Sequence, residues 1–327
     1  MRRRDFIKAI VGNAAAWPLT SRAQQVALPV IGYLTTGSPE SDAVSLAAFR
    51  EGLSETGYVE TQNVTIQYGW AEFQYERLAP MAADLVHHRV SAVATLGGTP
   101  SALVAKAATS TIPIVFFVGI DPVEFGLVAS YNHPGGNMTG VVGLQGDLTA
   151  KRIELLHEVL PKAAVVAFLV NPNNRFTETE TLILQDGARS LGLELHVVPA
   201  STTSEIDTAF RTLAGLRPGA LLVSADLVLL SKHKQLVALA AQQALPAVWP
   251  WREYVAAGGL MSYGTSLTEA GRLVGIYTGR ILKGTKPADL PVQQSVKVEL
   301  VINLKTAKTL GITIPVPLSG RADEMIE

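Results

Sequence analysis

The 327-residue chain contains no cysteine, and aromatic residues make up only 6% of it. Without thiols the chain forms no disulfide and offers no thiol for a lipid anchor, so packing alone must stabilise it. After Leu28 no run of about 20 uninterrupted apolar residues occurs, which is the length that a membrane-spanning helix needs. We therefore expect no stable membrane insertion of the chain beyond that point.

An excess of positive charge is also missing. Removal of residues 1–23 leaves 22 basic and 27 acidic residues, a net charge of −5. This balance argues against a nucleic-acid partner, because such binding needs a basic surface that displaces counterions from phosphate. It suits a protein that handles small molecules.

Motifs that carry catalysis, metal or nucleotide binding are absent as well. The sequence contains no HExxH, CxxC or GxSxG, and no GxGxxG follows the first predicted strand. Residues 279–286 have P-loop spacing, but the last two positions are reversed and the segment ends a helix. The sequence thus predicts no catalytic residue, no metal and no cofactor.

The N-terminus carries a clear export pattern. Arg3 and Arg4 open the run RRDFIK, a mildly apolar stretch follows over 10–19, and small residues lead to Ala23. This order predicts a twin-arginine signal peptide over residues 1–23, cleaved near Ala23, and a periplasmic protein. The alternative is an amphipathic first helix of the mature domain, which Pro18 and the basic head fit badly.

The chain that remains after removal of residues 1–23 is too long for one small core, so two domains are expected. A hydrophobic fraction of 48% supports large buried cores. Short β-branched runs alternate with helix-period segments, which is typical of βαβ units and parallel sheets covered on both faces. The predicted strands are 29–35, 64–68, 92–96, 112–118, 165–170, 193–198, 220–224, 260–263 and 297–303. A turn-rich break at 132–137 separates two series. The fold class is therefore α/β, with two Rossmann-like lobes, parallel sheets and a cleft between them.

The lobe boundaries are expected at 27–140 plus 262–290 for the first lobe, and at 141–261 plus 291–327 for the second. The C-terminal part of this division is the least determined, because sequence does not say which sheet a returning strand joins.

Ligands bind beyond the carboxyl ends of parallel strands, so the loops there contain the candidate residues. Thr36 and Ser38 follow the first strand. Gly98 and Thr99 follow the third, where Thr99 can cap a helix that Pro100 starts, and free N–H groups at a helix start can hold a carboxylate. An ordinary capped helix is the alternative.

Acidic, amide and aromatic residues occupy equivalent positions. Asp121 or Asp226 could hold an ammonium group, so that both ends of a zwitterion are recognised, although a single aspartate at such a position is more often a capping or turn residue. Asn171 lies in the corresponding loop of the second lobe. Four aromatic residues, Trp70, Trp249, Trp251 and Tyr263, lie near strand ends and could stack on a ligand or pack between the lobes.

At these loops the chain resembles a known family, the type I periplasmic substrate-binding proteins of ABC importers, in the branch described as tryptophan/tyrosine-type. The segments that carry the resemblance are 31–34, 37–41, 49–53, 97–100, 121–123, 126–128, 134–140, 151–156, 169–173 and 300–307. The resemblance implies a solute trapped between two lobes and passed to a membrane permease driven by a separate ATPase. It also implies that Gly98 and Thr99 hold a carboxylate, that Asp121 or Asp226 holds an ammonium, and that Ser38 and Asn171 add hydrogen bonds from opposite lobes.

The function expected from these features is capture of a small solute, an amino acid or a similar zwitterion, by hinge closure. Two alternatives stay open at this point. One is a periplasmic sensor subunit that reports to a signalling partner, and the other is an exported enzyme on the same scaffold. The enzyme would need an acid–base pair or nucleophile in the cleft, and no such pair is visible in the sequence.

Overall fold

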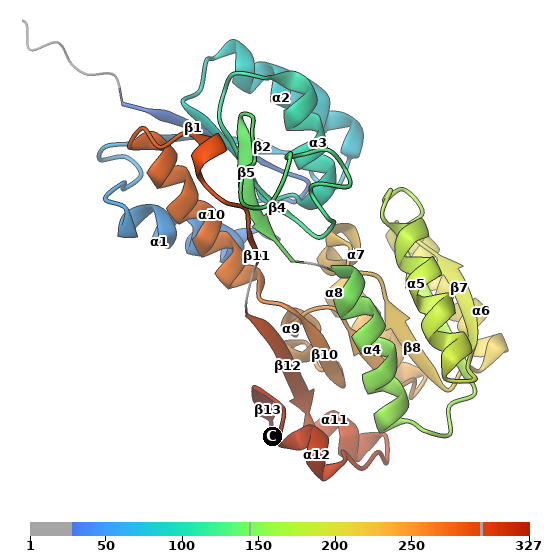
Figure 1. The fold of residues 1–327 in the computed structure, drawn as a ribbon. Coiled ribbons are helices and arrows are strands. Elements are labelled where there is room, and N and C mark those ends of the chain that lie inside the picture. Colours follow the sequence, from blue (N-terminus) through green and yellow to red (C-terminus); the bar gives the residue numbers. More distant parts are fainter. Residues whose placement is uncertain (1–27, 144, 295–296) are drawn as a thin grey trace, which may run out of the picture.

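The computed structural model describes residues 28–143, 145–294 and 297–327, and it divides into an upper and a lower lobe (Figure 1). The expected signal peptide and its cleavage site lie outside the described residues. Within the described ranges, no helix is both long and apolar enough to cross a membrane.

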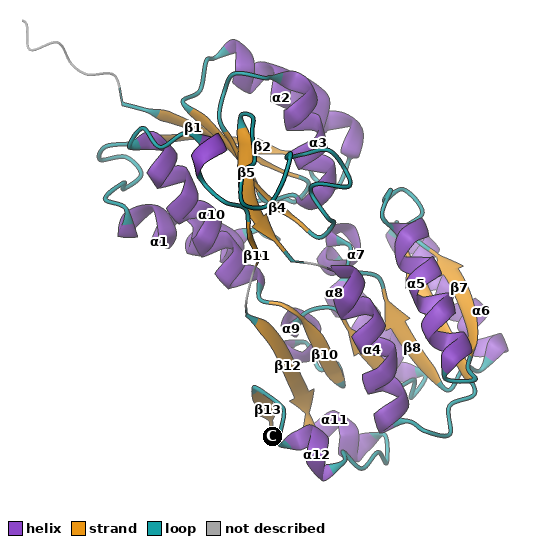
Figure 2. Cartoon of the chain, in the orientation of Figure 1, coloured by secondary structure: helices purple, strands orange, loops and turns teal. Residues whose placement is uncertain are grey.

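Lobe 1 is built on a six-stranded parallel sheet with the order β11-β5-β4-β3-β1-β2. Its strands are β1 (Val30–Thr35), β2 (Thr65–Trp70), β3 (Ala92–Thr95), β4 (Ile114–Val118), β5 (Met138–Val142) and β11 (Gln293–Gln294). Its helices are α1 (Ala43–Glu55), α2 (Leu78–His87), α3 (Gly98–Ala108) and α10 (Leu267–Leu282), with short 3₁₀ turns η1 (Tyr75–Arg77) and η2 (Pro287–Asp289). Helices therefore cover both faces of the sheet, as the continuous apolar strands require (Figure 2).

Lobe 2 contains a seven-stranded sheet with the order β13-β12-β10-β9-β8-β6-β7. Its strands are β6 (Val165–Val170), β7 (Glu194–Pro199), β8 (Ala220–Val223), β9 (Ala247–Trp249), β10 (Met261–Thr265), β12 (Val298–Asn303) and β13 (Glu324–Ile326). Its helices are α4 (Gln145–Val159), α5 (Thr177–Ser190), α6 (Thr203–Leu216), α7 (Leu227–Ser231), α8 (His233–Gln242), α9 (Arg252–Ala256), α11 (Leu304–Thr309) and α12 (Val316–Ser319). The β10–β12 pair is antiparallel, so this sheet is mixed, whereas the sequence predicted parallel sheets only.

Alternate residues of each strand enter separate cores on the two faces of a sheet, as the pleat of a strand demands. In β4, Val115 and Phe117 pack with α1 and α10, whereas Ile114, Phe116 and Val118 pack with α2 and α3. The β6 strand behaves in the same way between α6 and α8 on one face and α4 and α5 on the other. The two-lobed α/β prediction is confirmed.

The predicted lobe boundary near the C-terminus differs from the structure in two places. Residues 261–265 form β10, which pairs with β9 and β12 in the sheet of lobe 2, whereas the sequence assigned 262–290 to lobe 1. The short β11 joins β5 in lobe 1, although 291–327 was assigned to lobe 2. The chain therefore crosses between the lobes three times, after β5, after β10 and after β11. Hydrogen bonds between strands that are distant in the sequence decide which sheet each segment joins. The local sequence does not contain this information.

Helix α10 returns to lobe 1 because small residues let it lie directly on α1. A Cβ atom added at Gly275 would lie 2.1 Å from the Phe49 carbonyl oxygen, and one at Gly271 would lie 2.7 Å from the Ser45 carbonyl oxygen. These glycines are four residues apart and so lie on one face of the helix. The contact attaches the helix after the second crossing firmly to the first lobe.

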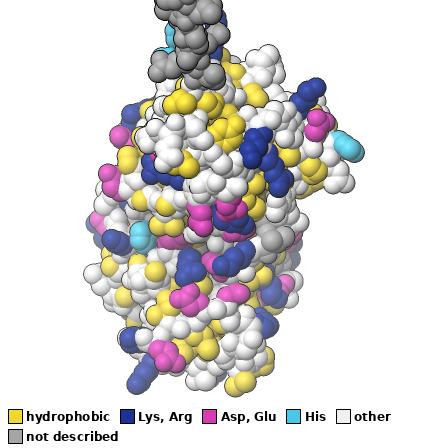
Figure 3. Space-filling model, turned by 90° about the vertical axis from the view of Figure 1, so that its left-hand side faces the viewer, with side chains coloured by type: hydrophobic (Ala, Val, Ile, Leu, Met, Phe, Trp, Pro, Cys, Tyr) yellow, Lys and Arg dark blue, Asp and Glu magenta, His cyan; other side chains and the backbone are white. Residues whose placement is uncertain are grey.

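The crossing segments are held to one another and to lobe 2. Thr265 donates a hydrogen bond of 3.0 Å to the Gly143 carbonyl, and the Ser266 N–H donates one to the Lys297 carbonyl. On the face of the molecule shown in Figure 3, positive and negative side chains mix around the level where the lobes meet. Ion pairs near the crossings include Arg272 with Glu269 and Lys297 with Glu299.

Candidate functional site

Two neighbouring cavities lie between the lobes. The larger has a volume of about 510 Å³ and the smaller about 50 Å³, and Phe117 and Leu227 line both. A site for one water needs roughly 10–15 Å³ on this measure, so the smaller cavity has room for a few waters only. The larger is within the usual size range of small-molecule sites.

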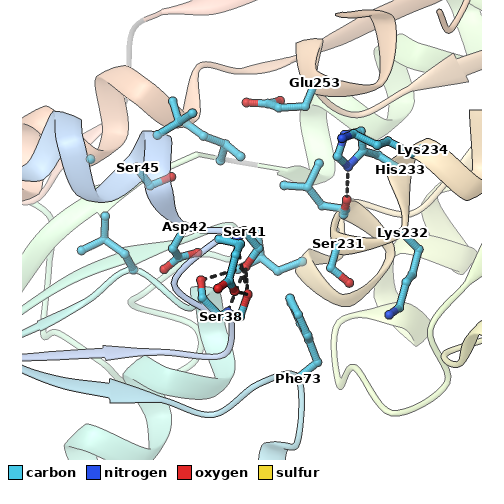
Figure 4. Close-up of a pocket in the computed structure, with 18 of the residues that line it drawn as sticks. Ser38, Ser41, Asp42, Ser45, Phe73, Ser231, Lys232, His233, Lys234 and Glu253 are labelled. Atoms are coloured by element: carbon cyan, nitrogen blue, oxygen red, sulfur yellow. Dashed lines mark hydrogen bonds between the residues drawn. The ribbon is translucent and has the colours of Figure 1, made fainter. Parts of the chain in front are cut away.

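Both lobes supply the walls of the larger cavity (Figure 4). Lobe 1 contributes the loop after β1, the first turns of α1 and α10, and Phe73. Lobe 2 contributes the segment from α7 into α8 and the start of α9. The polar side chains among the lining residues are Ser38, Glu40, Ser41, Asp42, Ser45, Ser231, Lys232, His233, Lys234, Gln235 and Glu253. A solute in this space would touch both halves of the molecule.

A hydrogen-bonded contact joins the lobes beside the smaller cavity. The Tyr75 hydroxyl of lobe 1 donates to Asp226 Oδ2 at 3.2 Å, and Asn171 Nδ2 donates to the same hydroxyl at 3.3 Å. Phe176, at the start of α5, is buried in the core of lobe 1 together with Ile120. The lobes are thus in contact across the crevice.

Asp226 is already satisfied by protein groups. Besides Tyr75, its carboxylate accepts hydrogen bonds from Asn171 at 3.2 Å, Asn174 at 2.8 Å and the Leu229 N–H at 3.0 Å. Burial raises the pKa of Asp226 above its ordinary value, and these hydrogen bonds oppose the shift. Asp226 caps α7 and anchors the interlobe contact, which leaves it little capacity for a ligand ammonium in this arrangement.

The other carboxylate named from the sequence, Asp121, lines neither cavity. Its Oδ1 accepts hydrogen bonds from the Val123 N–H at 2.8 Å and the Glu124 N–H at 3.3 Å. This is the turn-forming use of an aspartate, which was the alternative interpretation. Asn171 is buried and orders its own loop by accepting from the Asn173 N–H at 3.0 Å.

The remaining polar candidates divide between the two cavities. Thr36, Gly98 and Thr99 line the smaller one, whereas Ser38 lines the larger. Helix α3 begins at Gly98, which has a φ of +70°, so Gly97 is the N-cap and not Thr99 as expected. Backbone N–H groups in such a first turn have no intrahelical partner, and the helix start keeps its capacity for an anion.

The aromatic candidates lie in the cores. Trp70 packs on Tyr68 with ring centroids 5.4 Å apart, and Trp249 is buried and stacked on Tyr254 at 4.7 Å. Tyr263 packs in the core of lobe 2 and lines neither interlobe cavity. Trp251, the fourth aromatic residue named from the sequence, lines the smaller cavity together with Tyr75, Phe117 and Phe176, whereas Phe73 and Phe117 line the larger one. Packing therefore describes Trp70, Trp249 and Tyr263 better than ligand stacking does.

Sequence reasoning missed Tyr75, Lys232 and Glu253. Glu253 follows β9, a three-residue strand that was not predicted, although Trp249 and Trp251 beside it were noticed. Lys232 lies at the end of a one-turn helix after β8, and Tyr75 lies five residues beyond β2. All three lie in or directly after the first short helix or 3₁₀ turn beyond a strand, a region that a strand-end pattern does not include.

Asp42 lines the larger cavity and is almost fully buried. Burial raises its pKa from the ordinary value of 3.8 to about 6, against hydrogen bonding from Thr35 and Tyr33. The Tyr33 hydroxyl donates to Asp42 Oδ2 at 3.3 Å. The folded protein therefore holds the Asp42 proton at pH values where the unfolded chain has lost it.

This shift predicts a pH-dependent effect of Asp42→Asn. Because the folded-state pKa is raised, Asp42 lowers stability progressively as pH rises from about 4 through 6, and asparagine does not. Relative to the wild type, the variant should gain about 2 kcal/mol in unfolding free energy between pH 4.5 and 7.5, at about 1.4 kcal/mol per pKa unit. Urea unfolding of both proteins at the two pH values measures this difference. An equal pH dependence in the two proteins contradicts it.

Comparison with known proteins identifies related chains. The family model described as ABC transporter substrate binding protein matches residues 39–326. The tyrosine-binding protein of Clostridioides difficile strain R20291 is 28% identical over 264 residues, which cover 81% of this chain and 75% of that protein.

Two solved structures are similar over almost their whole length. One is an ABC domain in complex with L-Trp from Streptococcus pneumoniae, with a TM-score of 0.82 and 27% identity over 92% of this chain and 100% of that one. The other is a conserved domain protein from Vibrio cholerae O1 biovar El Tor, with a TM-score of 0.82 and 26% identity over 91% and 99%. The family match covers most of the sequence, and both solved structures share the fold of this chain. The chain belongs to the ABC transporter substrate-binding protein family, whose members bind solutes and are not enzymes.

Proposed function

We propose that this protein captures an amino acid, most suitably an aromatic one, between its lobes and delivers it to the permease of an ABC importer. The observation that carries the proposal is the cavity of about 510 Å³ lined by both lobes. Its walls combine apolar and aromatic residues with serine, lysine and carboxylate groups, which is the make-up of a site for a small amphipathic molecule. The named ligands of two relatives, tyrosine and L-Trp, support the same class.

Closure of the lobes supplies the mechanism. A solute that contacts both lobes binds the closed form more tightly than the open form and shifts the equilibrium toward closure. The Tyr75 contacts with Asp226 and Asn171 add protein–protein hydrogen bonds that the closed form alone can make. The permease would then distinguish loaded from empty protein by the relation of the two lobes.

Export fits this role. We include in the proposal that residues 1–23 direct the chain through the twin-arginine route, so that capture takes place in the periplasm. The run from Arg3 to Lys8 is the feature that supports it.

The experiment is a binding screen of the mature protein by thermal shift and isothermal titration calorimetry. The panel contains L-tryptophan, L-tyrosine, L-phenylalanine, the other amino acids and neutral sugars. We expect stabilisation and saturable heat with aromatic amino acids. Binding of sugars alone, or silence across the panel, contradicts the proposal.

Tyr75→Phe tests the closing contact. Loss of the hydroxyl removes two interlobe hydrogen bonds and should weaken solute affinity about 5- to 30-fold, since each such bond contributes roughly 1 kcal/mol at most. Calorimetry measures affinity, and small-angle scattering measures whether the ligand-free protein becomes more open. Tyr68→Phe is the control, because the Tyr68 hydroxyl bonds Arg50 and Glu60 within lobe 1. Equal affinities of Tyr75→Phe and the wild type would show that the contact does not assist closure.

A further inference from the structure

The side chain amide of Gln145 has one end fixed by the protein. Gln145 is the first residue of α4, where the chain enters lobe 2, and it is 4% exposed. Arg152 Nη2 donates a hydrogen bond of 2.8 Å to its Oε1. Because a guanidinium has donors and no acceptor, the amide must turn its oxygen toward Arg152 and its nitrogen away from it. The position of Gln145 Nε2 is therefore set by Arg152.

The nitrogen end of this amide has no protein partner in the described ranges. Gln145 lines the smaller interlobe cavity, and its Nε2 forms no hydrogen bond with a described residue. A buried N–H donor without an acceptor is costly, so such a donor at a cavity wall points to a group that binds there. That group must carry a hydrogen-bond acceptor.

Gly119 in lobe 1 gives the Gln145 side chain its place. The Gln145 N–H donates a hydrogen bond of 2.9 Å to the Gly119 carbonyl. A Cβ atom added at Gly119 would lie 2.6 Å from Gln145 Cγ, so the absence of a side chain there lets the glutamine lie close to the end of β4. Gly119 also lines the smaller cavity. An amide of lobe 2 thus lies at the carboxyl edge of the lobe 1 sheet, where parallel sheets bind ligands.

The first turn of α3 supplies further donors to the same cavity. Gly98 and Thr99 line it, and their N–H groups come before the first intrahelical hydrogen bond. The cavity has room for a few waters only, so a small group inside it is near every wall. Asp226 is the one carboxylate among the described lining residues, and it already accepts four hydrogen bonds. The remaining capacity of these walls is that of donors.

Resting on the function proposed above, we propose that the smaller cavity takes the carboxylate of the solute and that Gln145 Nε2 donates a hydrogen bond to it, together with the first turn of α3. The amino-acid side chain then extends into the larger cavity, since Phe117 and Leu227 line both spaces. Gly98 and Thr99 belong to lobe 1, whereas Gln145 belongs to lobe 2. One carboxylate therefore contacts both lobes, and its binding favours the closed form.

The test replaces the amide nitrogen of Gln145 by an oxygen. Gln145→Glu keeps an acceptor for Arg152 but loses the donor and adds a negative charge beside the expected carboxylate. Gln242→Glu is the matched control, because it makes the same change at an exposed residue of α8 that lines neither interlobe cavity. The probes are L-tryptophan, L-tryptophanamide, which has a neutral amide in place of the carboxylate, and tryptamine, which has neither. Titration calorimetry gives each affinity, and circular dichroism checks that each variant is folded.

The wild type should bind L-tryptophan at least about 10-fold more tightly than tryptamine, since donors built for a carboxylate stay unpaired without it. We expect Gln145→Glu to weaken L-tryptophan about 10-fold or more, and L-tryptophanamide and tryptamine by less than about 3-fold. Gln242→Glu should bind all three probes within about 2-fold of the wild type. If Gln145→Glu does not fold, Gln145→Met removes the same donor without adding a charge, and the same order of effects is expected.

The possible failures can be told apart. If the wild type binds none of the aromatic amino acids, the proposed function is wrong and this inference falls with it. If the wild type binds L-tryptophan and the folded Gln145 variant binds it equally well, the assignment of Gln145 alone is overturned. Equal weakening of L-tryptophan and tryptamine shows a structural effect and also overturns that assignment. A wild type that binds tryptamine as tightly as L-tryptophan contradicts a carboxylate site in the smaller cavity.

Discussion

Gly275→Ala should lower the free energy of unfolding by about 3 kcal/mol or more, although it adds a single methyl group. The new Cβ would lie 2.1 Å from the Phe49 carbonyl oxygen and 2.9 Å from the Leu53 nitrogen. These are backbone atoms of α1, which no side-chain rotation can move away. Helices α1 and α10 must separate, and the buried contacts of Phe49, Leu53 and Val274 loosen with them.

Gly215→Ala is the matched control for this prediction. Gly215 lies near the end of α6 with open space around its Cβ position and a negative φ, so alanine should stabilise the protein by roughly 0.5 kcal/mol through its helix propensity. Urea unfolding followed by circular dichroism compares the two variants with the wild type. A loss below 1 kcal/mol for Gly275→Ala would show that the close approach of the helices is not required.

Most of the fold could be predicted because its strands are continuous apolar runs. The β6 strand over 165–170 was predicted to the residue, and β1, β3 and β4 to within two residues at each end. The strands that were missed lack this signal. Strand β5 contains Gly140 and follows a turn-rich segment, β9 and β13 have three residues each, and β11 consists of two glutamines. Their pairing with distant strands holds them in place, and a local pattern does not contain that information.

The candidate site was predicted less well, for a related reason. The sequence placed the candidate residues at the correct edge of both sheets, beyond the carboxyl ends of the strands. The residues that do line the interlobe cavities are Thr36, Ser38, Gly98, Thr99 and Asp226. It could not show that Asp226 is occupied by Tyr75 from the other lobe, because 151 residues separate the two. Nor could it show that the aromatic side chains at strand ends point into the cores. The identity of a loop residue indicates its chemistry, whereas its free capacity depends on the neighbours that folding brings to it.

Arg152 illustrates how strongly such neighbours can matter. The side chain is 2% exposed, and its guanidinium bonds Gln145 Oε1 at 2.8 Å, the Tyr263 carbonyl at 3.0 Å and Glu180 Oε1 at 3.4 Å. Gln145 follows the first crossing between the lobes, and Tyr263 precedes the second. Glu180 also accepts hydrogen bonds from Thr149 at 2.9 Å and from Ser224, two residues before Asp226. Arg152 thus links the crossing segments to the loop that carries the interlobe contact.

Arg152→Met should therefore lower the unfolding free energy by about 3–5 kcal/mol, the usual cost of leaving one member of a buried ion pair uncompensated. The unpaired group is Glu180, which is fully buried, and the Tyr263 carbonyl and Gln145 lose their donor as well. Adding Glu180→Gln to the same protein should recover part of the loss, because it removes the unpaired charge and keeps an oxygen acceptor.

Lys151→Met is the control variant. Lys151 is next to Arg152 in the sequence but forms an exposed ion pair with Glu154, so the change should alter stability by less than about 0.5 kcal/mol. Denaturant unfolding of the four proteins measures these differences, and a double variant less stable than Arg152→Met would show that hydrogen bonding to Glu180, rather than its unpaired charge, dominates the loss.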